Sequence, residues 1–264
     1  MPNKDPLFPD SDPLATSLLS RAYEAQVRFF YPRELSVFRS CERWRRAQSI
    51  LDVGTGNGCF VQRLALDFPE KQYTAIDIDH AQIAIAKATN LTGVSFLVGE
   101  AKQTHGRYDA VLLRFVAQHL PDLSSVLRQL SGVLGESGTI YITEGDERLA
   151  QFDPSPEAFR QMFRVLAAQR QSIGADFDIV EHMDGVAGAS GLRLLEVREA
   201  RATTTDCGGL QGMWDMQAAI LAYLKHLNVV PYDYEGAGRD LLQWFSTHRC
   251  YGQEGLKMFK FGRS

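Results

Sequence analysis

The sequence predicts an α/β fold built on a doubly wound, mostly parallel sheet of seven strands. Three observations carry this prediction. Short apolar runs alternate with segments of helical periodicity between residues 49 and 146, a glycine-rich turn follows the first apolar run, and helical segments interrupt the later strands. The 264 residues, 45% hydrophobic and 23% charged, match one globular domain with insertions.

The alternating segments give the expected position of each element. Apolar runs predict central parallel strands, because helices cover both faces of a parallel sheet and bury its strands on both sides. We expect strands at residues 49–53, 73–78, 94–99, 108–115, 138–145, 191–200 and 255–261. We expect helices at residues 59–68, 80–88, 123–134, 154–172, 210–227 and 238–248.

The N-terminal region differs from this alternating part. Residues 1 to about 14 are rich in Pro and Asp, which is typical of a disordered tail. Residues 15–46 show mixed three- and four-residue apolar spacing, which predicts one or two helices interrupted near Pro32. The aromatic residues of this stretch, Tyr23 among them, either shape an apolar ligand pocket or pack the helix onto the sheet.

These patterns predict how the chain is divided. Residues 1–46 form a tail and a helical cap, and residues 47–264 form the main domain. Helical insertions lie near residues 151–185 and 205–250. At the carboxyl ends of the strands, such insertions would cover the crevice in which open α/β sheets bind ligands.

Charge and cysteine content exclude several classes of function. A net charge of −4 and a pI near 5.9 provide no long-range attraction for nucleic acid. The sequence contains neither a secretory signal nor an apolar run long enough to span a bilayer, so we expect a soluble cytoplasmic protein. The four cysteines are too widely spaced for a zinc or CxxC site, which predicts reduced thiols and no metal: Cys41, Cys59, Cys207 and Cys250.

The turn at residues 54–58 reads Gly-Thr-Gly-Asn-Gly and joins a predicted strand to a predicted helix. Glycines at this place let the backbone approach a ligand closely. A dinucleotide fingerprint needs a third glycine at position 59, where this chain has Cys59. The spacing therefore disfavours an NAD-binding oxidoreductase.

Two acids follow at the end of the second predicted strand. Asp77 lies about 20 residues beyond the glycines, where a carboxylate can accept hydrogen bonds from both hydroxyls of a ribose. Asp79 is the better candidate for the N-cap of the helix that starts near His80. We therefore expect Asp77 to bind the ligand and Asp79 to cap the helix.

This order of motifs resembles the class I S-adenosylmethionine (SAM) methyltransferases. The resemblance covers roughly residues 49–146 and rests on five pieces in sequence: L-D-x-G-x-G-x-G at 51–58, the acid ending the second strand, Val-Gly-Glu-Ala at 98–101, the strand at 108–114, and Gln-His-Leu-Pro-Asp at 118–122 before the Gly-Thr-Ile at 138–140. It implies SAM as cofactor and S-adenosylhomocysteine as product.

The resemblance also implies the roles of individual residues. The glycine turn would pack beneath the methionine part of SAM, with Asp52 near its amino group, and Asp77 would hold the ribose. Ile78, Glu100 and Ala101 would meet the adenine, and Arg114 would lie near the methyl group. The implied cofactor-binding residues are Asp52, Gly54, Thr55, Gly56, Asp77, Ile78, Glu100, Ala101 and Arg114.

Three residues are candidates for catalysis, each with an alternative role. Arg114 binds the SAM carboxylate or an anionic acceptor, or else forms a salt bridge with Glu144 or Asp146. His119 is a candidate base or a local hydrogen-bonding residue. Glu144 and Asp146 orient or deprotonate an acceptor, or else begin the next helix as solvated acids.

The residues that follow the fourth predicted strand bear on the class of methyl acceptor. Relatives that methylate nucleic acids or proteins often carry Asn/Asp-Pro-Pro-aromatic there, whereas this chain reads Arg-Phe-Val-Ala at 114–117. The resemblance therefore implies a small-molecule acceptor, with oxygen slightly favoured over nitrogen or carbon. Two alternatives stay open: a SAM-fold enzyme of another class, such as a cyclase, and a non-catalytic SAM-binding partner subunit. A homodimer packed through residues 210–227 also stays open.

Overall fold

One mixed sheet organises the part of the chain that the computed structural model describes, residues 12–264 without 173, 177 and 248. Its strand order is β3-β2-β1-β4-β5-β8-β6, and β7 pairs with β8. The strands are β1 Ser49–Val53, β2 Gln72–Asp77, β3 Val94–Val98, β4 Tyr108–Arg114, β5 Leu134–Gly145, β6 Gln151–Asp153, β7 Leu192–Thr203 and β8 Tyr251–Arg263. The first five are parallel, and β8 runs antiparallel to β5, β6 and β7. The mostly parallel α/β sheet is thus confirmed, with the short β6 as an additional strand.

Helices cover both faces of this sheet, as expected for a doubly wound fold. One apolar core lies under the second half of α1, α2, α3 and α4, and includes Trp44 and Phe60. The other lies under α5 and α7 and includes Leu127 and Met183. The helices are α1 Pro13–Ser40, α2 Glu42–Arg46, α3 Cys59–Asp67, α4 His80–Ala88, α5 Leu123–Gly132, α6 Glu157–Gln171, α7 Ile179–Gly188, α8 Gly209–Leu227 and α9 Tyr234–Ser246. Three short 3₁₀ turns are η1 Ala101–Gln103, η2 Ala117–His119 and η3 Glu147–Leu149.

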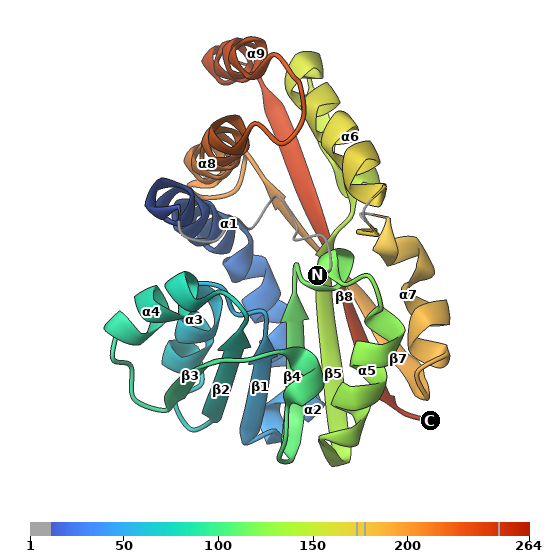
Figure 1. Cartoon of the computed structure of the whole chain (residues 1–264). Coiled ribbons are helices and arrows are strands. Elements are labelled where there is room, and N and C mark those ends of the chain that lie inside the picture. The colour runs from blue at the N-terminus through green and yellow to red at the C-terminus, as the bar shows by residue number, and fades with distance from the viewer. Residues whose placement is uncertain (1–11, 173, 177, 248) are drawn as a thin grey trace.

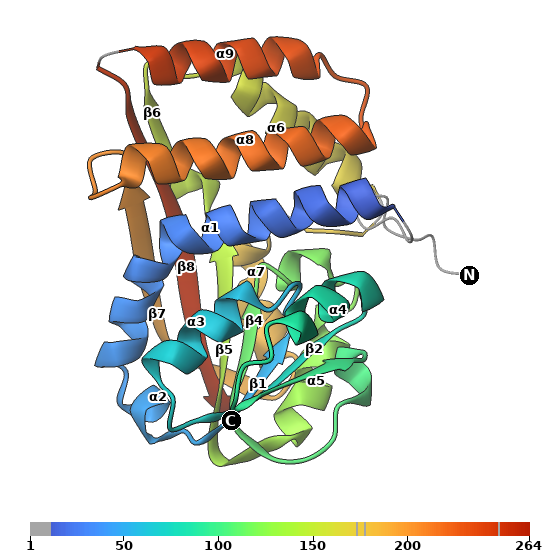
Figure 2. The same cartoon turned by 90° about the vertical axis from the view of Figure 1, so that its left-hand side faces the viewer.

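A helical layer lies beyond the carboxyl ends of the parallel strands (Figure 1). It has an apolar core of its own, in which α1, α6, α8 and α9 supply residues such as Leu19, Met162, Tyr223 and Leu241. Figure 2 shows α1, α8 and α9 stacked one above another over the sheet. The expected helical cover at this edge is therefore present, and α8, the helix considered for dimerisation, packs against α1 and α9.

The N-terminal helix corrects one expectation. Instead of being interrupted near Pro32, α1 continues through it from Pro13 to Ser40. A proline removes one helix hydrogen bond and bends the axis, and Figure 2 shows α1 bending down towards α2. Buried residues on both sides of Pro32, Phe29 and Phe38 among them, hold the bent helix on the sheet. Asp12 caps its start, and the expected tail at residues 1–11 lies outside the described residues.

The remaining boundaries differ in small ways. The helix expected at residues 238–248 begins earlier, at Tyr234, because Asp233 caps it through the amide of Gly236. β6 and α7 were not expected from the sequence. β6 has only three residues, and α7 contains Gly185 and Gly188, which weaken a helical pattern.

Gly58 shows how tightly the first strand–helix turn is packed. It has φ of +76°, and an added Cβ would lie 2.6 Å from Cε1 of Phe96. We expect Gly58→Ala to lower the free energy of unfolding by about 1–3 kcal/mol, through backbone strain and overpacking. Urea denaturation measures this, with Gly99→Ala as control because no atom lies within 4 Å of its added Cβ. Equal effects of the two substitutions would contradict the packing argument.

Candidate active site

The candidate site lies where the carboxyl ends of β1, β2 and β4 meet. The last residue of β1, Val53, pairs with Ile76 of β2 on one side and with Leu113 of β4 on the other. The glycine turn leaves β1 at this point, and Asp77 and Arg114 end the two neighbouring strands. The parallel sheet therefore brings together three segments that are far apart in sequence.

The glycine turn is bonded to β2 through successive amides. The amides of Gly54 and Thr55 donate to the carbonyl of Ile76 at 2.8 and 3.0 Å, and the amide of Gly56 donates to Oδ2 of Asp77 at 2.7 Å. Gly56 takes φ of +56°, which favours glycine. A pyrophosphate site needs such amides free to face the anion. This geometry therefore supports the argument from spacing against a dinucleotide.

Asp77 keeps capacity to bind a ligand. Its Oδ1 accepts from the amide of Asp79 at 2.9 Å, and its Oδ2 accepts from Gly56, so each oxygen has a second lone pair. Burial raises the pKa of this carboxyl, and the two amide hydrogen bonds oppose the shift. Asp79 caps α4 by accepting from the amides of Ala81 and Gln82. The structure thus has Asp79 as the helix cap, as expected.

The neighbouring candidate residues differ in exposure. Ile78 follows Asp77 and is 67% exposed, so its apolar side chain is accessible beside the carboxyl group. Glu100 is exposed beyond β3, and Ala101 is half-buried at the start of η1. The strand order puts β3 next to β2, so these three residues border one edge of the site.

Asp52 lies deep in the same region. Its side chain is buried at the penultimate position of β1. Burial raises its pKa to about 7, although the charge of Arg114 lowers it. At neutral pH a carboxyl group with this pKa is partly protonated. A cationic group that binds next to it would favour the ionised form.

Helix α1 covers the glycine turn. A Cβ placed on Gly56 would lie 2.7 Å from Cε2 of Tyr23, and one on Gly54 would contact Val116. Burial and the charge of Asp77 raise the pKa of the Tyr23 hydroxyl. Tyr23 therefore packs against the turn itself, and a ligand over Gly54 and Gly56 requires the Tyr23 and Val116 side chains to rotate.

Arg114 is held by α1 and not by the acids considered from the sequence. Its Nε and Nη2 donate to the two oxygens of Glu34 at 2.7 and 3.1 Å, and its Nη1 donates to Gln26 at 3.1 Å. Its guanidinium lies over the rings of Phe60 and Phe115. The side chain of Arg114 is only 8% exposed and that of Glu34 is fully buried, so this bidentate ion pair is largely shielded from solvent. The alternative of a salt bridge with Glu144 or Asp146 is wrong, because Glu34 and Gln26 of α1 occupy the donors of the guanidinium.

Phe115 directly follows Arg114 in a strained conformation. Its φ is +56°, which is rare for a bulky residue and costs about 1–3 kcal/mol. Its ring lies near Phe30 of α1, and a Cβ on Gly145 would lie 3.5 Å from its Cε1. The strained backbone thus puts an aromatic ring between α1 and the end of β5.

His119 accepts a hydrogen bond at Nδ1, so this ring nitrogen does not act as a base. Its Nδ1 lies 3.0 Å from Nη2 of Arg170, a fully buried side chain on α6. A guanidinium only donates, so Nδ1 is the acceptor and the ring proton of the neutral imidazole lies on Nε2. In this tautomer His119 is a donor through Nε2, and the bond ties η2 to α6.

Glu144 is buried at the end of β5, and it supports the segment after β4. Its Oε1 accepts from the amides of Ala117 and Gln118 at 2.7 and 3.4 Å, and its Oε2 is buried without a hydrogen bond in the described part of the chain. Burial raises its pKa to about 8, against the effect of those two amides. Glu144 is therefore not a solvated acid.

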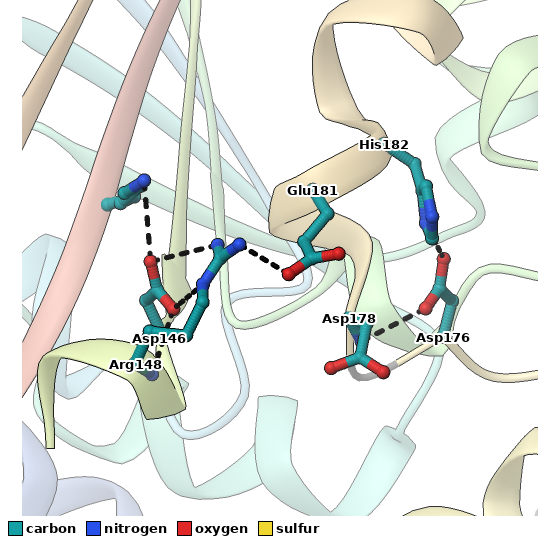
Figure 3. Close-up of polar contacts among 7 residues, drawn as sticks. Asp146, Arg148, Asp176, Asp178, Glu181 and His182 are labelled. Atoms are coloured by element: carbon teal, nitrogen blue, oxygen red, sulfur yellow. Dashed lines mark hydrogen bonds and ion pairs between the residues drawn. The ribbon is translucent and has the colours of Figure 1, made fainter.

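Asp146 belongs to a polar cluster on the α7 side (Figure 3). Burial would raise its pKa, but hydrogen bonds from Arg148 and the charge of Lys257 lower it. Arg148 also pairs with Glu181 of α7. His182, which points to Asp176 in Figure 3, is 60% exposed. His248 lies outside the described residues. No group of three or more potential metal ligands occurs in the part of the chain that is described.

Two residues of this site were not found from the sequence. Glu34 and Gln26 lie on α1, far from the motifs around the glycine turn. One signal for Glu34 was present: the acid stands between Tyr31 and Phe38 at three- and four-residue spacing, on the apolar stripe of the helix. A charge at such a position indicates a buried partner.

Comparisons with known proteins identify the family. A family described as "Methyltransferase domain" matches residues 45–199, more than half of the chain. The chain therefore belongs to this methyltransferase domain family. A malonyl-[acyl-carrier protein] O-methyltransferase of Bacillus anthracis is 32% identical over 110 residues, which cover 40% of this chain and 41% of the relative. The chain thus matches about two fifths of that relative's length.

Solved structures show the same fold. The O-methyltransferase of a trans-AT PKS multienzyme of Brevibacillus brevis, in complex with S-adenosyl-L-homocysteine, has a TM-score of 0.52 and 16% identity, covering 93% of this chain and 75% of its own. The [4+2]-cyclase SpnF has a TM-score of 0.51 and 16% identity, covering 82% of this chain and 75% of its own. At these identities the likeness concerns the fold. No described helix is long and apolar enough to cross a membrane.

The buried ion pair gives a stability prediction. Glu34→Ala leaves the Arg114 charge buried without its carboxylate, so the free energy of unfolding should fall by about 3–5 kcal/mol. Adding Arg114→Met should restore part of this loss. Chemical denaturation measures both effects, with Glu42→Ala as control: its pair with Arg46 is exposed and should contribute less than about 1 kcal/mol. A similar small loss for Glu34→Ala would show that the pair does not hold α1.

The buried Glu144 predicts a pH dependence of stability. Its folded-state pKa of about 8 lies above its unfolded value, so the folded state binds the proton more tightly. This contribution is present at low pH and is lost as the pH rises towards about 8. Glu144→Gln should remove it, making the decline of unfolding free energy between pH 5 and 8 shallower by up to about 1.4 kcal/mol per unit. The exposed Glu136→Gln should follow the wild-type curve, and an unchanged slope in Glu144→Gln would refute the assignment.

Proposed function

We propose that this chain is a SAM-dependent methyltransferase that transfers a methyl group to a small molecule. The observation that carries the proposal is the bond between Gly56 and Asp77, which joins the glycine turn to a carboxylate with free lone pairs. Membership of the methyltransferase domain family supports it. S-Adenosyl-L-homocysteine, named with the Brevibacillus brevis structure, is the expected product here.

The residues present fit an adenosyl sulfonium ligand. Asp77 would hold the ribose hydroxyls, and Ile78, Glu100 and Ala101 would border the adenine. Asp52 would face the amino group, since its carboxyl has a pKa of about 7 and gains a cation as partner. Gly54, Thr55 and Gly56 would lie beneath the methionine part, with Tyr23 and Val116 rotated aside. A ligand with positive groups and a ribose needs carboxylates and no phosphate-binding amides, which is the set found here.

The chemistry asks little of the protein beyond alignment. SAM, when bound, supplies a methyl group on a positively charged sulfur. Aligning donor and acceptor alone provides effective molarities of about 10⁵ M or more. Glu144 holds the segment that carries Val116 and His119, and Phe115 presents its ring towards the acceptor space. The charge of Arg114 is neutralised by Glu34, so the role of Arg114 is to position α1 over the site. His119 acts as a hydrogen-bond donor through Nε2.

An oxygen acceptor is favoured on the names of similar proteins. The Bacillus anthracis relative and the Brevibacillus brevis structure are both O-methyltransferases. The cyclase and partner-subunit alternatives differ from this proposal in one measurable outcome. A methyltransferase converts SAM to S-adenosylhomocysteine stoichiometrically with acceptor methylation, whereas the other two bind SAM without consuming it.

Calorimetric titration tests the cofactor first. We expect S-adenosylhomocysteine and SAM to bind with micromolar dissociation constants and NAD not to bind. Asp77→Ala should weaken adenosyl binding at least about tenfold by removing charged hydrogen bonds to the ribose. Gly56→Val should abolish binding, because a side chain there is strained at φ of +56° and would lie against the Tyr23 ring, which must rotate to admit the ligand.

Asp79→Ala is the matched control for Asp77→Ala. It removes the cap of α4 and costs about 1 kcal/mol of stability, but it leaves the ribose carboxylate in place, so adenosyl affinity should change less than about threefold. Equal losses in both variants, or binding of neither adenosyl ligand to the wild type, would overturn the cofactor assignment.

A further inference from the structure

A second carboxyl group lies over the same edge of the sheet. β8 continues beyond the end of β5, where Leu256 pairs with Gly145, and Glu254 lies two residues further along. Alternate residues of a strand share a face, so Glu254 is on the face of Leu256 and Met258, which belong to the core shared with α1 and α8. Glu254 therefore lies on the face of the sheet that the helical layer covers, which is also the side on which Arg114 lies.

The position of Glu254 relative to the candidate site follows from strand register. Arg114, Thr143 and Met258 lie side by side across β4, β5 and β8. Glu254 is four residues beyond this row, or about 13 Å along the strand. That distance suits contact with the far end of an acceptor whose reacting end lies near β4.

Glu254 is half-buried, and it has one hydrogen-bond partner among the described side chains. Its Oε1 accepts from Nε2 of Gln217 on α8 at 2.5 Å, and it forms no ion pair with the described residues. Gln217 is 4% exposed, and its Oε1 is buried without a partner in the described part of the chain. Buried polar atoms in proteins are nearly always paired, so the unpaired amide oxygen of Gln217, beside a carboxyl group that has one hydrogen bond, needs an explanation.

The charged groups around Glu254 do not balance it. Burial raises its pKa to about 8; the charge of Glu147 in η3 adds to the shift, and the charge of Arg160 in α6 and the hydrogen bond from Gln217 oppose it. Arg160 and Glu147 pair with each other, at 3.7 Å between Nη2 and Oε2. A carboxyl group and an amide oxygen without a compensating cation match a ligand that brings both positive charge and N–H groups.

We propose that Glu254 and Gln217 form a binding subsite for a protonated amine carried by the methyl acceptor. The proposal rests on the proposed function, because it assigns the substrate class of that site. On binding, the carboxyl group loses its proton to solvent and pairs with the ammonium, and the amide oxygen of Gln217 accepts one of its N–H groups. The acceptor is then a small molecule with an amine at one end and the methylated atom at the other.

Direct titration of Glu254 tests the subsite without cofactor or turnover. The wild-type protein, labelled with ¹³C at the glutamate carboxyl carbon, is titrated by NMR in methylammonium chloride, tetramethylammonium chloride or sodium chloride at equal concentration. The Glu254 signal is the one missing from Glu254→Gln. Gln217→Met, which shifts the same signal, provides the assignment if that variant does not fold. The exposed Glu199, paired with Arg201, is the internal control.

The expected result is a lower apparent pKa of Glu254 in methylammonium than in either other salt, by about half a unit or more, which corresponds to about threefold favoured ionisation. The chemical shift of the Glu199 control signal should not depend on which of the three salts is present. Equal titration of Glu254 in methylammonium and sodium would overturn the subsite, and so would an equal shift in tetramethylammonium, which has charge but no N–H. Failure of the proposed function would appear separately, as absent S-adenosylhomocysteine binding in calorimetry.

Discussion

The buried ion pair between Arg114 and Glu34 is the interaction on which the arrangement of this site depends. It joins the end of β4 to a helix that ends at Ser40, before the first strand begins at Ser49, and the pair is almost completely shielded from solvent. Two buried charges are stable only as a pair, so the position of α1 over the glycine turn is set by electrostatics as well as by packing. Tyr23 and Phe30 reach the turn and Phe115 because the pair holds the helix there.

Much of the fold follows from local sequence patterns. Apolar runs followed by helical spacing predict strands and helices correctly between residues 49 and 146, because each of these elements buries a face that its own residues define. The glycine turn and Asp79 follow from backbone requirements that are also local: positive φ and a helix cap. Asp77 is bonded to the turn for the same reason, since the strand before it pairs with the strand before the glycines.

What the sequence does not predict depends on contacts between distant segments. Nothing near Arg114 indicates that its partner is Glu34, eighty positions earlier. Pro32 predicts a break, but burial on both sides of it keeps the helix continuous. The positive φ of Phe115 and the buried pair of Gln217 with Glu254 exist only because strands and helices from both halves of the chain meet at one edge. The roles of residues that depend on such long-range contacts are the ones that motif spacing does not predict.

The position of β8 bears on how the chain can fold as it is made. This strand pairs with β5 and β6 along one edge and with β7 along the other. Since β6 and β7 pair with β8 alone among the described strands, they have no hydrogen-bonding neighbour in the sheet until residues 251–263 have emerged from the ribosome. Until then, the edge of β5 presents unpaired amides and carbonyls to other chains. The sheet is therefore completed late in folding and requires contacts between residues far apart in sequence. Chaperone binding should matter most before β8 pairs with these strands.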